Sequence, residues 1–527
     1  MSKSWLVSAA LFLVAVGASP VTGQSAEVVR NRNTPEPVTG HQVIDKQLHH
    51  LQELIVRLRV ARSGVFMAMG GGRAMAPVSG DAATQLAAQL RHELNQLEES
   101  LLALRVAKAE SRPGVGPIES ISVMVAGAAD LARIDLPEHE GLDPLSWEIA
   151  NVGSEPISNP RVVFEEQLGG FDVGAVERSV LAGVEGDLPK AQRLWEFLVE
   201  NRFHSAPPSP RSEVVDPIKL INVYGYCHAD GASGAFAALA GRAGLEVRLW
   251  KLNGHVVAEV LCDDSWRMFD CDAEVFYRGP SGGPASVADL QRDPALLDHP
   301  VLVPGRSKPR YSMNTIQRIW SQVEDHHILD VSAPGLLHDM GFVLRPGERI
   351  VRQWGHQGLR VPEIGYQVPE SFANGQWIYE YALAPGETPP IELDFDLPYP
   401  IVAGRVSVRF SSISSRRDWV VEARTQGAEW QALPWGKSAM RVFPASIGSA
   451  LGAAGSGPDY TLNVRVAPTH QDARATIDWV RVELVFQLAP QSLPRLHSGR
   501  NDVRWVSESP GAEASIHYRY RGQDEAH

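Results

Sequence analysis

Short stretches in which apolar and polar residues alternate fill the chain from about residue 340 onward, and they restrict its fold more than any other feature. Gly, Pro and Asn separate these stretches, which run over 377–383, 391–395, 406–410, 419–424, 460–466 and 477–486. Evenly spaced short strands with such turns are typical of antiparallel β-sandwiches. We therefore predict a jelly-roll β-sandwich over 341–510 and a tail over 511–527.

The chain has 527 residues, more than one hydrophobic core usually holds, so several domains are expected. Strand-like pieces at 146–149 and 161–164 lie among Pro and Gly, and an amphipathic helical pattern covers 189–203. The domains predicted ahead of the sandwich are a β-rich lead-in over 111–185, a core of helices and strands over 186–280 and a connecting region over 281–340. The predicted fold class is multidomain α+β.

Composition limits the partners of the chain. Apolar residues make up 44% and charged residues 21%, as in soluble globular proteins. The formal net charge is −13, and the acidic residues are spread along the chain. Nucleic-acid binding needs clustered Lys and Arg, so we expect no nucleic-acid partner.

Residues 1–23 have the pattern of a signal peptide. Lys3 supplies a positive charge, an apolar run covers 5–18, and small residues allow cleavage after Ala18 or Gly23. The run is short for a membrane span, although an uncleaved anchor has the same appearance. No later stretch is long and apolar enough to cross a bilayer. We predict a secreted, periplasmic or cell-surface protein without a stable membrane span after cleavage.

Two heptad-like patterns predict a helical hairpin over 40–110. Leu and Ile recur with alternating steps of four and three residues in both segments. The positions are Ile44, Leu48, Leu51, Ile55 and Leu58, and then Leu90, Leu94, Leu97, Leu101 and Leu104. Either this hairpin folds on itself, or residues 44–104 form a short coiled coil that joins copies of the chain.

Three cysteines occur, and an odd number leaves at least one thiol free or paired between molecules. Cys227 precedes an Ala- and Gly-rich stretch with apolar residues at helical spacing, and Gly244 suits the end of such a helix. The dipole at a helix N-terminus favours an anion, so we expect a lowered pKa for the Cys227 thiol. Cys227 is therefore a candidate nucleophile, with Asp230 as the helix cap.

A β-hairpin is predicted after this helix, because two apolar-rich stretches flank Asp263-Asp264-Ser265. With a two-residue turn at Asp263-Asp264, His255 and Asp270 become diagonal neighbours on one face of the hairpin. A turn one residue earlier puts them directly opposite each other. In either arrangement the carboxylate can orient the imidazole, whose other nitrogen takes the Cys227 proton. Asp272 shares this face and is a second candidate for the acid.

The segment 190–278 resembles the bacterial transglutaminase-like superfamily. The matching elements are Gly225-Tyr226-Cys227, 243–248, Gly254-His255, Glu259-Val260, Trp266 and Asp270, in that order. The resemblance implies a papain-like α+β core. It also implies Cys227 as nucleophile, His255 as general base and acid, Asp270 as its orienting partner and Trp266 as a structural aromatic. An inactive descendant would keep the same elements.

The other two cysteines, Cys262 and Cys271, lie on the predicted hairpin. In a tight hairpin their sulfur atoms are too far apart for a disulfide, so we expect two free, partly buried thiols. We see no cluster with metal-ligand spacing and expect neither a metal nor a cofactor.

Two segments near the sandwich, 344–354 and 492–501, resemble motifs of secreted bacterial proteins that lie beside carbohydrate-active domains. The sandwich is also rich in Trp, at positions 377, 419, 430, 435, 479 and 505. Exposed Trp rings can stack on sugars, whereas buried ones fill the core. A carbohydrate-binding role and a purely structural role are the two alternatives for this part of the chain.

The combined features lead to two hypotheses of function. The first is an exported thiol enzyme that hydrolyses or transfers an acyl group through a thioester on Cys227. Its substrate would be a peptide, a glycoprotein, a polysaccharide or another cell-wall component. The second is a secreted carbohydrate-binding or surface-assembly protein that uses the same fold as a scaffold.

Overall fold

The computed structural model describes most of the chain after residue 117. The described residues are 118–136, 142–164, 172–204, 211–329, 337–353, 362–363, 366–367, 373–383, 389–436, 441–451, 458–489, 492–493 and 496–522. The predicted signal peptide over 1–23 and the predicted helical hairpin over 40–110 lie outside these residues. Among the described residues, no helix is both long enough and apolar enough to cross a bilayer.

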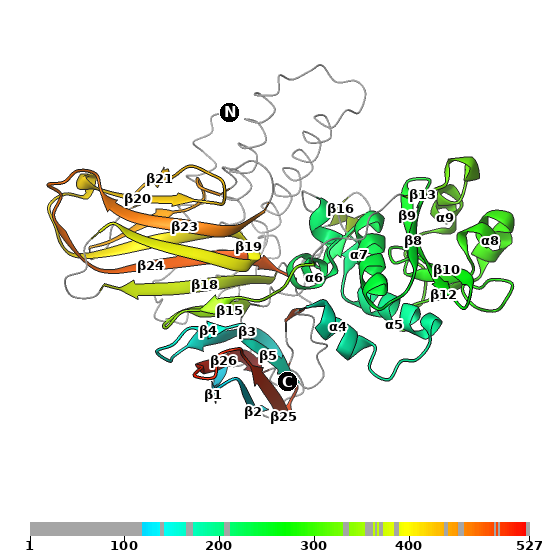
Figure 1. Cartoon of the computed structure of the whole chain (residues 1–527), viewed down its shortest axis with the longest axis horizontal. Helices are drawn as coiled ribbons and strands as arrows, with labels where there is room; N and C mark the ends of the chain where they lie inside the picture. Colours follow the sequence, from blue (N-terminus) through cyan, green and yellow to red (C-terminus); the bar gives the residue numbers. More distant parts are fainter. Residues whose placement is uncertain are drawn as a thin grey trace, which may run out of the picture.

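One sheet of eleven strands dominates the described structure (Figure 1). Its strands, in spatial order, are β1 (Ile118–Ala126), β26 (Glu513–Gly522), β3 (Leu142–Asn151), β15 (Arg349–Gln353), β18 (Ala373–Ala382), β24 (Ala475–Leu488), β19 (Ile391–Ile413), β23 (Asp459–Pro468), β20 (Trp419–Arg424) and β21 (Gln431–Leu433). A further strand, β22 (Val442–Ser446), pairs with β19. Every pairing in this sheet is antiparallel.

Smaller sheets and short helices complete the fold. A three-stranded sheet joins β2 (Ala129–Leu136), β25 (Gly499–Val506) and β5 (Arg161–Phe164). Strand pairs are formed by β14 (Val343–Leu344) with β4 (Ile157–Ser158), β11 (Val275–Tyr277) with β12 (Pro300–Leu302), and β16 (Pro362–Glu363) with β17 (Tyr366–Gln367). Outlying helices are α4 (Val173–Val180), α8 (Val287–Arg292), α9 (Met313–Ile319), η1 (Arg211–Val214), η3 (Pro294–Asp298), η4 (Val323–Asp325) and η5 (Arg416–Asp418).

The predicted fold class is wrong. A multidomain α+β protein with a papain-like core was expected, but strands make up 48% and helices 21% of the structure, and large antiparallel sheets dominate it. Local patterns identified individual strands, yet they could not show that strands from both ends of the chain join one sheet. The architecture is β-sandwich-like.

The longest strand, β19, changes its partners along its length. Its first part pairs with β23, and from Ile401 onward it pairs with β24. The register breaks between Asp396 and Ile401, where Pro398 and Pro400 lack the N–H groups that a continuous ladder needs. The strand therefore changes partner at this break, from β23, which pairs with β20, to β24, which pairs with β18.

The two ends of the described chain lie side by side. β1 pairs with β26 along its whole length, from Ile118 opposite Arg521 to Ala126 opposite Glu513. β26 also pairs with β3, which in turn pairs with β15. The predicted β-rich lead-in therefore contributes strands to the large sheet, and the segment predicted as a tail, 511–527, contains β26.

A separate four-stranded sheet lies in the segment that contains the cysteines. It is formed by β10 (Ser265–Phe269), β9 (His255–Cys262), β8 (Val247–Leu252) and β13 (His327–Leu329). Helices α5 (Asp187–Glu200) and α7 (Ala229–Arg242) pack against each other and against β9 (Figure 1). The apolar side of α5 is buried, as its helical pattern predicts.

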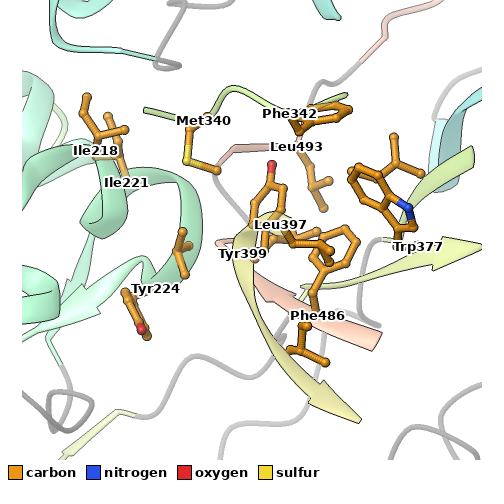
Figure 2. Packing of buried hydrophobic residues seen from close by; sticks show 14 of the residues in the cluster. Ile218, Ile221, Tyr224, Met340, Phe342, Trp377, Leu397, Tyr399, Phe486 and Leu493 are labelled. Atoms are coloured by element: carbon orange, nitrogen blue, oxygen red, sulfur yellow. The ribbon is translucent and has the colours of Figure 1, made fainter. Parts of the chain in front are cut away.

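This segment joins the large sheet through a shared apolar core (Figure 2). Ile218 and Ile221, from the turns α6 (Pro217–Lys219) and η2 (Leu220–Tyr224), belong to this core together with Met340 and Tyr399 (Figure 2). The Asn222 carbonyl accepts a hydrogen bond from the Ala489 N–H at 2.9 Å, just beyond β24. Glu213 accepts hydrogen bonds from Tyr224 at 2.9 Å and Tyr460 at 2.5 Å, so polar contacts reinforce the junction.

Gly375 allows two strands of the large sheet to close over an aromatic ring. It lies opposite Phe486 in the pairing of β18 with β24, and a Cβ atom at this position would be 1.9 Å from the Phe486 ring. The other side of Phe486 is stacked on Tyr399, with ring centroids 4.5 Å apart. The ring has no room to move, so only Gly fits.

We expect Gly375→Ala to lower the free energy of unfolding by about 2–3 kcal/mol, because the added methyl group overpacks the core. Chemical denaturation checks this value. Gly241→Ala is the matched control: Gly241 is exposed on α7 with open space around its Cα, and Ala favours the helix by about 1 kcal/mol. Equal stability of Gly375→Ala and the wild type would contradict the packing argument.

Candidate functional site

Cys227 lies at the entrance to α7. The π-helical turn η2 ends at Gly225, whose φ of +71° is a left-handed conformation that favours Gly, and β7 (Tyr226–Cys227) follows. α7 then begins with His228 as its N-cap, so the prediction of Asp230 as the cap is wrong. A Cβ atom at Gly231 would be 2.9 Å from the Cys227 Cβ, so Gly231 lets the helix approach the cysteine closely.

The predicted hairpin has the predicted register. β9 and β10 pair Cys262 with Ser265 and Trp266 with Leu261, across a two-residue turn. Asp263 and Asp264 have φ values of +49° and +58°, the conformation that a type I′ turn requires at both positions. This register brings the ends of the two strands, where His255 and Asp270 lie, next to each other.

His255 and Asp270 are hydrogen-bonded. The His255 Nε2 atom is 2.8 Å from the Asp270 Oδ2 atom, and both side chains are buried. The second carboxylate oxygen of Asp270 accepts from the backbone N–H groups of Asp272 at 3.0 Å and Ala273 at 2.8 Å. These bonds fix the carboxylate, which in turn orients the imidazole and leaves Nδ1 as its other nitrogen.

Helix α7, which begins two residues after Cys227, is tied to the strand that begins with His255. The Ser233 hydroxyl, on the second turn of α7, donates to the carbonyl of Val256 at 2.9 Å, directly beside His255. The Trp195 indole of α5 donates to the Asp270 carbonyl at 3.2 Å. Both helices are therefore anchored to the strand ends that hold His255 and Asp270.

Asp272 is the centre of a second polar cluster beside Cys227. Its Oδ1 atom is 3.1 Å from Arg202 Nη1 and 2.8 Å from His204 Nδ1, and its Oδ2 atom accepts from the Tyr311 hydroxyl at 2.5 Å. Arg202 also donates to the Cys271 carbonyl. Asp272 and Arg202 have side chains only 1% exposed. The sequence left Asp272 as an alternative partner for His255, and the structure instead joins it to these three side chains.

Burial decides the protonation of the cysteine. Desolvation raises the pKa of the Cys227 thiol to about 12, although the neighbouring Arg202 guanidinium acts to lower it. The expectation of a lowered pKa from the helix N-terminus is therefore wrong, because the loss of water outweighs the dipole. Cys227 is a neutral thiol in this structure.

At His255 and Asp272, neighbouring charges outweigh the effect of burial on the pKa. Burial acts to lower the pKa of His255, but the Asp270 carboxylate outweighs it and raises this pKa above 6.5. Burial acts to raise the pKa of Asp272, but Arg202 and His204 hold it well below 3.8. Asp272 is therefore ionised at neutral pH.

Glu259, one of the residues on which the resemblance to the transglutaminase-like superfamily rests, has a structural role. It is fully buried and accepts hydrogen bonds from Arg248 at 2.6 Å, Trp250 at 2.5 Å and the Val287 N–H at 2.6 Å. The Arg248 guanidinium also lies over the Trp266 ring, 3.9 Å from its centroid. These contacts tie β8, β9 and β10 to the start of α8 and stabilise the hairpin from its far side.

All three cysteines are free and buried, so the expected absence of a Cys262–Cys271 disulfide is confirmed. Burial raises the pKa of Cys262 to about 11 and that of Cys271 well above 9.0. Neither thiol is activated. Within the described ranges, no group of three His, Cys, Asp or Glu side chains could hold a metal ion.

Three of the six sandwich tryptophans fill the core. Trp377, Trp419 and Trp505 are buried, with at most 4% of their surface exposed. Trp430 is partly exposed, but the guanidinium groups of Arg424 and Arg465 each lie 4.5 Å from its ring centroid. The three buried rings are therefore not available for stacking on a sugar.

Sequence reasoning missed Arg202, His204 and Tyr311. Arg202 lies between α5 and β6 (Phe203–His204), and His204 lies in β6. A charged residue so close to an apolar helix was the only available signal. Tyr311 lies in an irregular stretch before α9 and had no signal.

Comparisons with known proteins leave the family open. No protein-family model and no curated protein matches the chain. The VP2 subviral particle of infectious bursal disease virus is 8% identical over 37% of this chain and 57% of that chain, with a TM-score of 0.14. The Gt strain structure of the same virus is 10% identical over 77% of this chain and 79% of that chain, with a TM-score of 0.15. Such TM-scores define neither a shared fold nor a shared function.

We expect Asp272→Asn to lower the free energy of unfolding at neutral pH by about 3–5 kcal/mol, because it leaves the buried Arg202 without a countercharge. The native pKa of Asp272 is depressed, so its contribution is complete above the unfolded value of 3.8 and is lost as pH falls below it. Denaturation at several pH values should show that the difference in the free energy of unfolding between Asp272→Asn and the wild type becomes smaller in acid. A difference that does not change with pH would contradict the ionic origin of the effect.

Proposed function

We propose that this chain is an exported, transglutaminase-like thiol enzyme that hydrolyses or transfers acyl groups through a thioester on Cys227. The observation that carries the proposal is the 2.8 Å hydrogen bond between His255 and Asp270, on a hairpin against which the Cys227 helix packs. A peptide, glycoprotein or cell-wall polymer fits the predicted export of the chain. The first 23 residues supply the basis for that export.

In the proposed reaction Cys227 is the nucleophile, His255 transfers the proton and Asp270 supports His255. The His255 Nδ1 atom takes the thiol proton as the Cys227 sulfur attacks the acyl carbon. His255 then gives this proton to the leaving group when the bond between the acyl carbon and that group breaks. The Asp270 carboxylate stabilises the imidazolium between these two transfers, as the raised pKa of His255 indicates. Water or an amine afterwards cleaves the thioester.

A second candidate function has its own supporting observation. Cys227 is completely buried and its thiol pKa is about 12, which suits a structural cysteine in a non-catalytic surface-assembly or binding protein. Alkylation separates the two. The enzyme requires that iodoacetamide modify Cys227 faster in the wild type than in His255→Ala, because His255 takes the thiol proton, whereas a scaffold predicts the same slow rate in both.

Substitution of Cys227 or His255 should abolish or slow acylation by 4-nitrophenyl acetate, followed as acetyl-enzyme in intact mass spectra. Cys227→Ala should give no acetyl-enzyme from this site, because the nucleophile is gone. His255→Ala should slow acetylation by about 10²–10⁴-fold, since proton transfer is lost. Cys262→Ala is the matched control, a buried free thiol on the same hairpin, and should acetylate at the wild-type rate. Unchanged acetylation in Cys227→Ala would refute the proposal.

The pH dependence of acetylation should report on the pair of His255 and Asp270. The rate should rise with pH as His255 loses its proton, with a midpoint above the ordinary 6.5 because Asp270 raises the pKa of His255. Asp270→Asn removes that charge, so its midpoint should move to lower pH while its maximal rate falls. Rates between about pH 5 and pH 9 measure both effects. A midpoint that stays in place or moves upward would show that Asp270 does not control this ionisation.

A further inference from the structure

A second histidine lies beside Cys227. Strands β6 and β7 pair in parallel, with His204 opposite Cys227 and Phe203 opposite Tyr226. The Phe203 N–H donates to the Gly225 carbonyl at 2.7 Å and fixes this register. Directly paired residues of neighbouring strands project to the same face, so the side chains of His204 and Cys227 share one face.

His204 has its own carboxylate, in the same arrangement as His255. The His204 Nδ1 atom is 2.8 Å from Asp272, and the His255 Nε2 atom is 2.8 Å from Asp270. The Tyr311 ring lies edge-on to both imidazoles, with centroids 6.0 Å from His204 and 5.9 Å from His255. Tyr311 therefore adjoins both pairs.

The groups around His204 keep it oriented. Arg202, 3.1 Å from Asp272, holds this carboxylate as an anion, and the Tyr311 hydroxyl occupies its second oxygen. The His228 ring is stacked on His204, with centroids 5.0 Å apart and an interplanar angle of 25°. The imidazole thus has one nitrogen on Asp272, and its Nε2 atom points away from that carboxylate.

We propose that His204 and Asp272 form a second acid–base pair, which activates the molecule that attacks the Cys227 thioester. This inference rests on the proposed acyl-transfer function. A water or primary amine forms a bond to the acyl carbon as its proton moves to the His204 Nε2 atom. The bond between carbon and sulfur breaks, its electron pair stays on the Cys227 sulfur, and the proton on His204 passes to that sulfur. The product leaves and the thiol is restored.

The acyl-enzyme intermediate provides the test. His204→Asn keeps a donor for Asp272 but removes the titratable base. With 4-nitrophenyl acetate, acetylation of Cys227 should keep its rate within about threefold, because His255 still serves this step. Loss of the acetyl group should slow by about 10²-fold or more, so that acetyl-enzyme accumulates in intact mass spectra.

A matched control and distinct outcomes keep the two proposals separate. His327→Asn changes an exposed histidine of β13 and should alter neither step. If His204→Asn slows both steps equally, or neither, His204 is not the second base, although the thioester chemistry stands. If the wild type forms no acetyl-enzyme at Cys227, the proposed function itself fails. Thermal denaturation of His204→Asn shows whether its fold is retained; for an unfolded variant, His204→Gln repeats the measurement.

Discussion

The buried ion pair between Arg202 and Asp272 is the contact on which the site depends. Both side chains are only 1% exposed. A buried charge is stable only beside an opposite charge, so neither side chain can move away without leaving the other charge unpaired in an apolar environment. Arg202 begins the short link from α5 to β6, and Asp272 follows the hairpin end. Their pairing fixes the strand of His204 and the hairpin end relative to each other. Because β6 in turn pairs with β7, the same contact restrains Cys227.

Asp270 and Asp272, two residues apart in the turn after β10, have different roles. Asp270 accepts two backbone N–H groups with one oxygen and His255 with the other, so it both shapes the turn and orients an imidazole. Asp272 projects from the turn so shaped and reaches His204 and Arg202. A change at Asp270 would therefore disturb both histidines, whereas a change at His204 leaves the turn intact.

Local interactions made part of this arrangement predictable. The hairpin register follows from the two-residue turn at Asp263-Asp264, and α5 and α7 follow from their helical patterns. The parallel pair of His204 with Cys227 and the approach of Tyr311 to Asp272 join residues far apart in the sequence, and no periodicity encodes them. The predicted fold class was wrong for the same reason, because β1 pairs with β26 although the two strands lie near opposite ends of the described chain. The thiol pKa was wrong because desolvation depends on tertiary packing.

Burial of Cys227 also defines how the proposed chemistry would have to begin. With a thiol pKa of about 12, Cys227 rests as a thiol and not as a preformed thiolate, while Asp270 and Asp272 raise the pKa of His255. Proton transfer from sulfur to His255 creates two opposite charges at once, and in a dry site each is stabilised by the other and by a fixed neighbour, Arg202 or Asp270. The charges then exist only while the sulfur attacks the acyl carbon. Such a site would spare its thiol from oxidation at rest, since the thiolate is the species that oxidants attack.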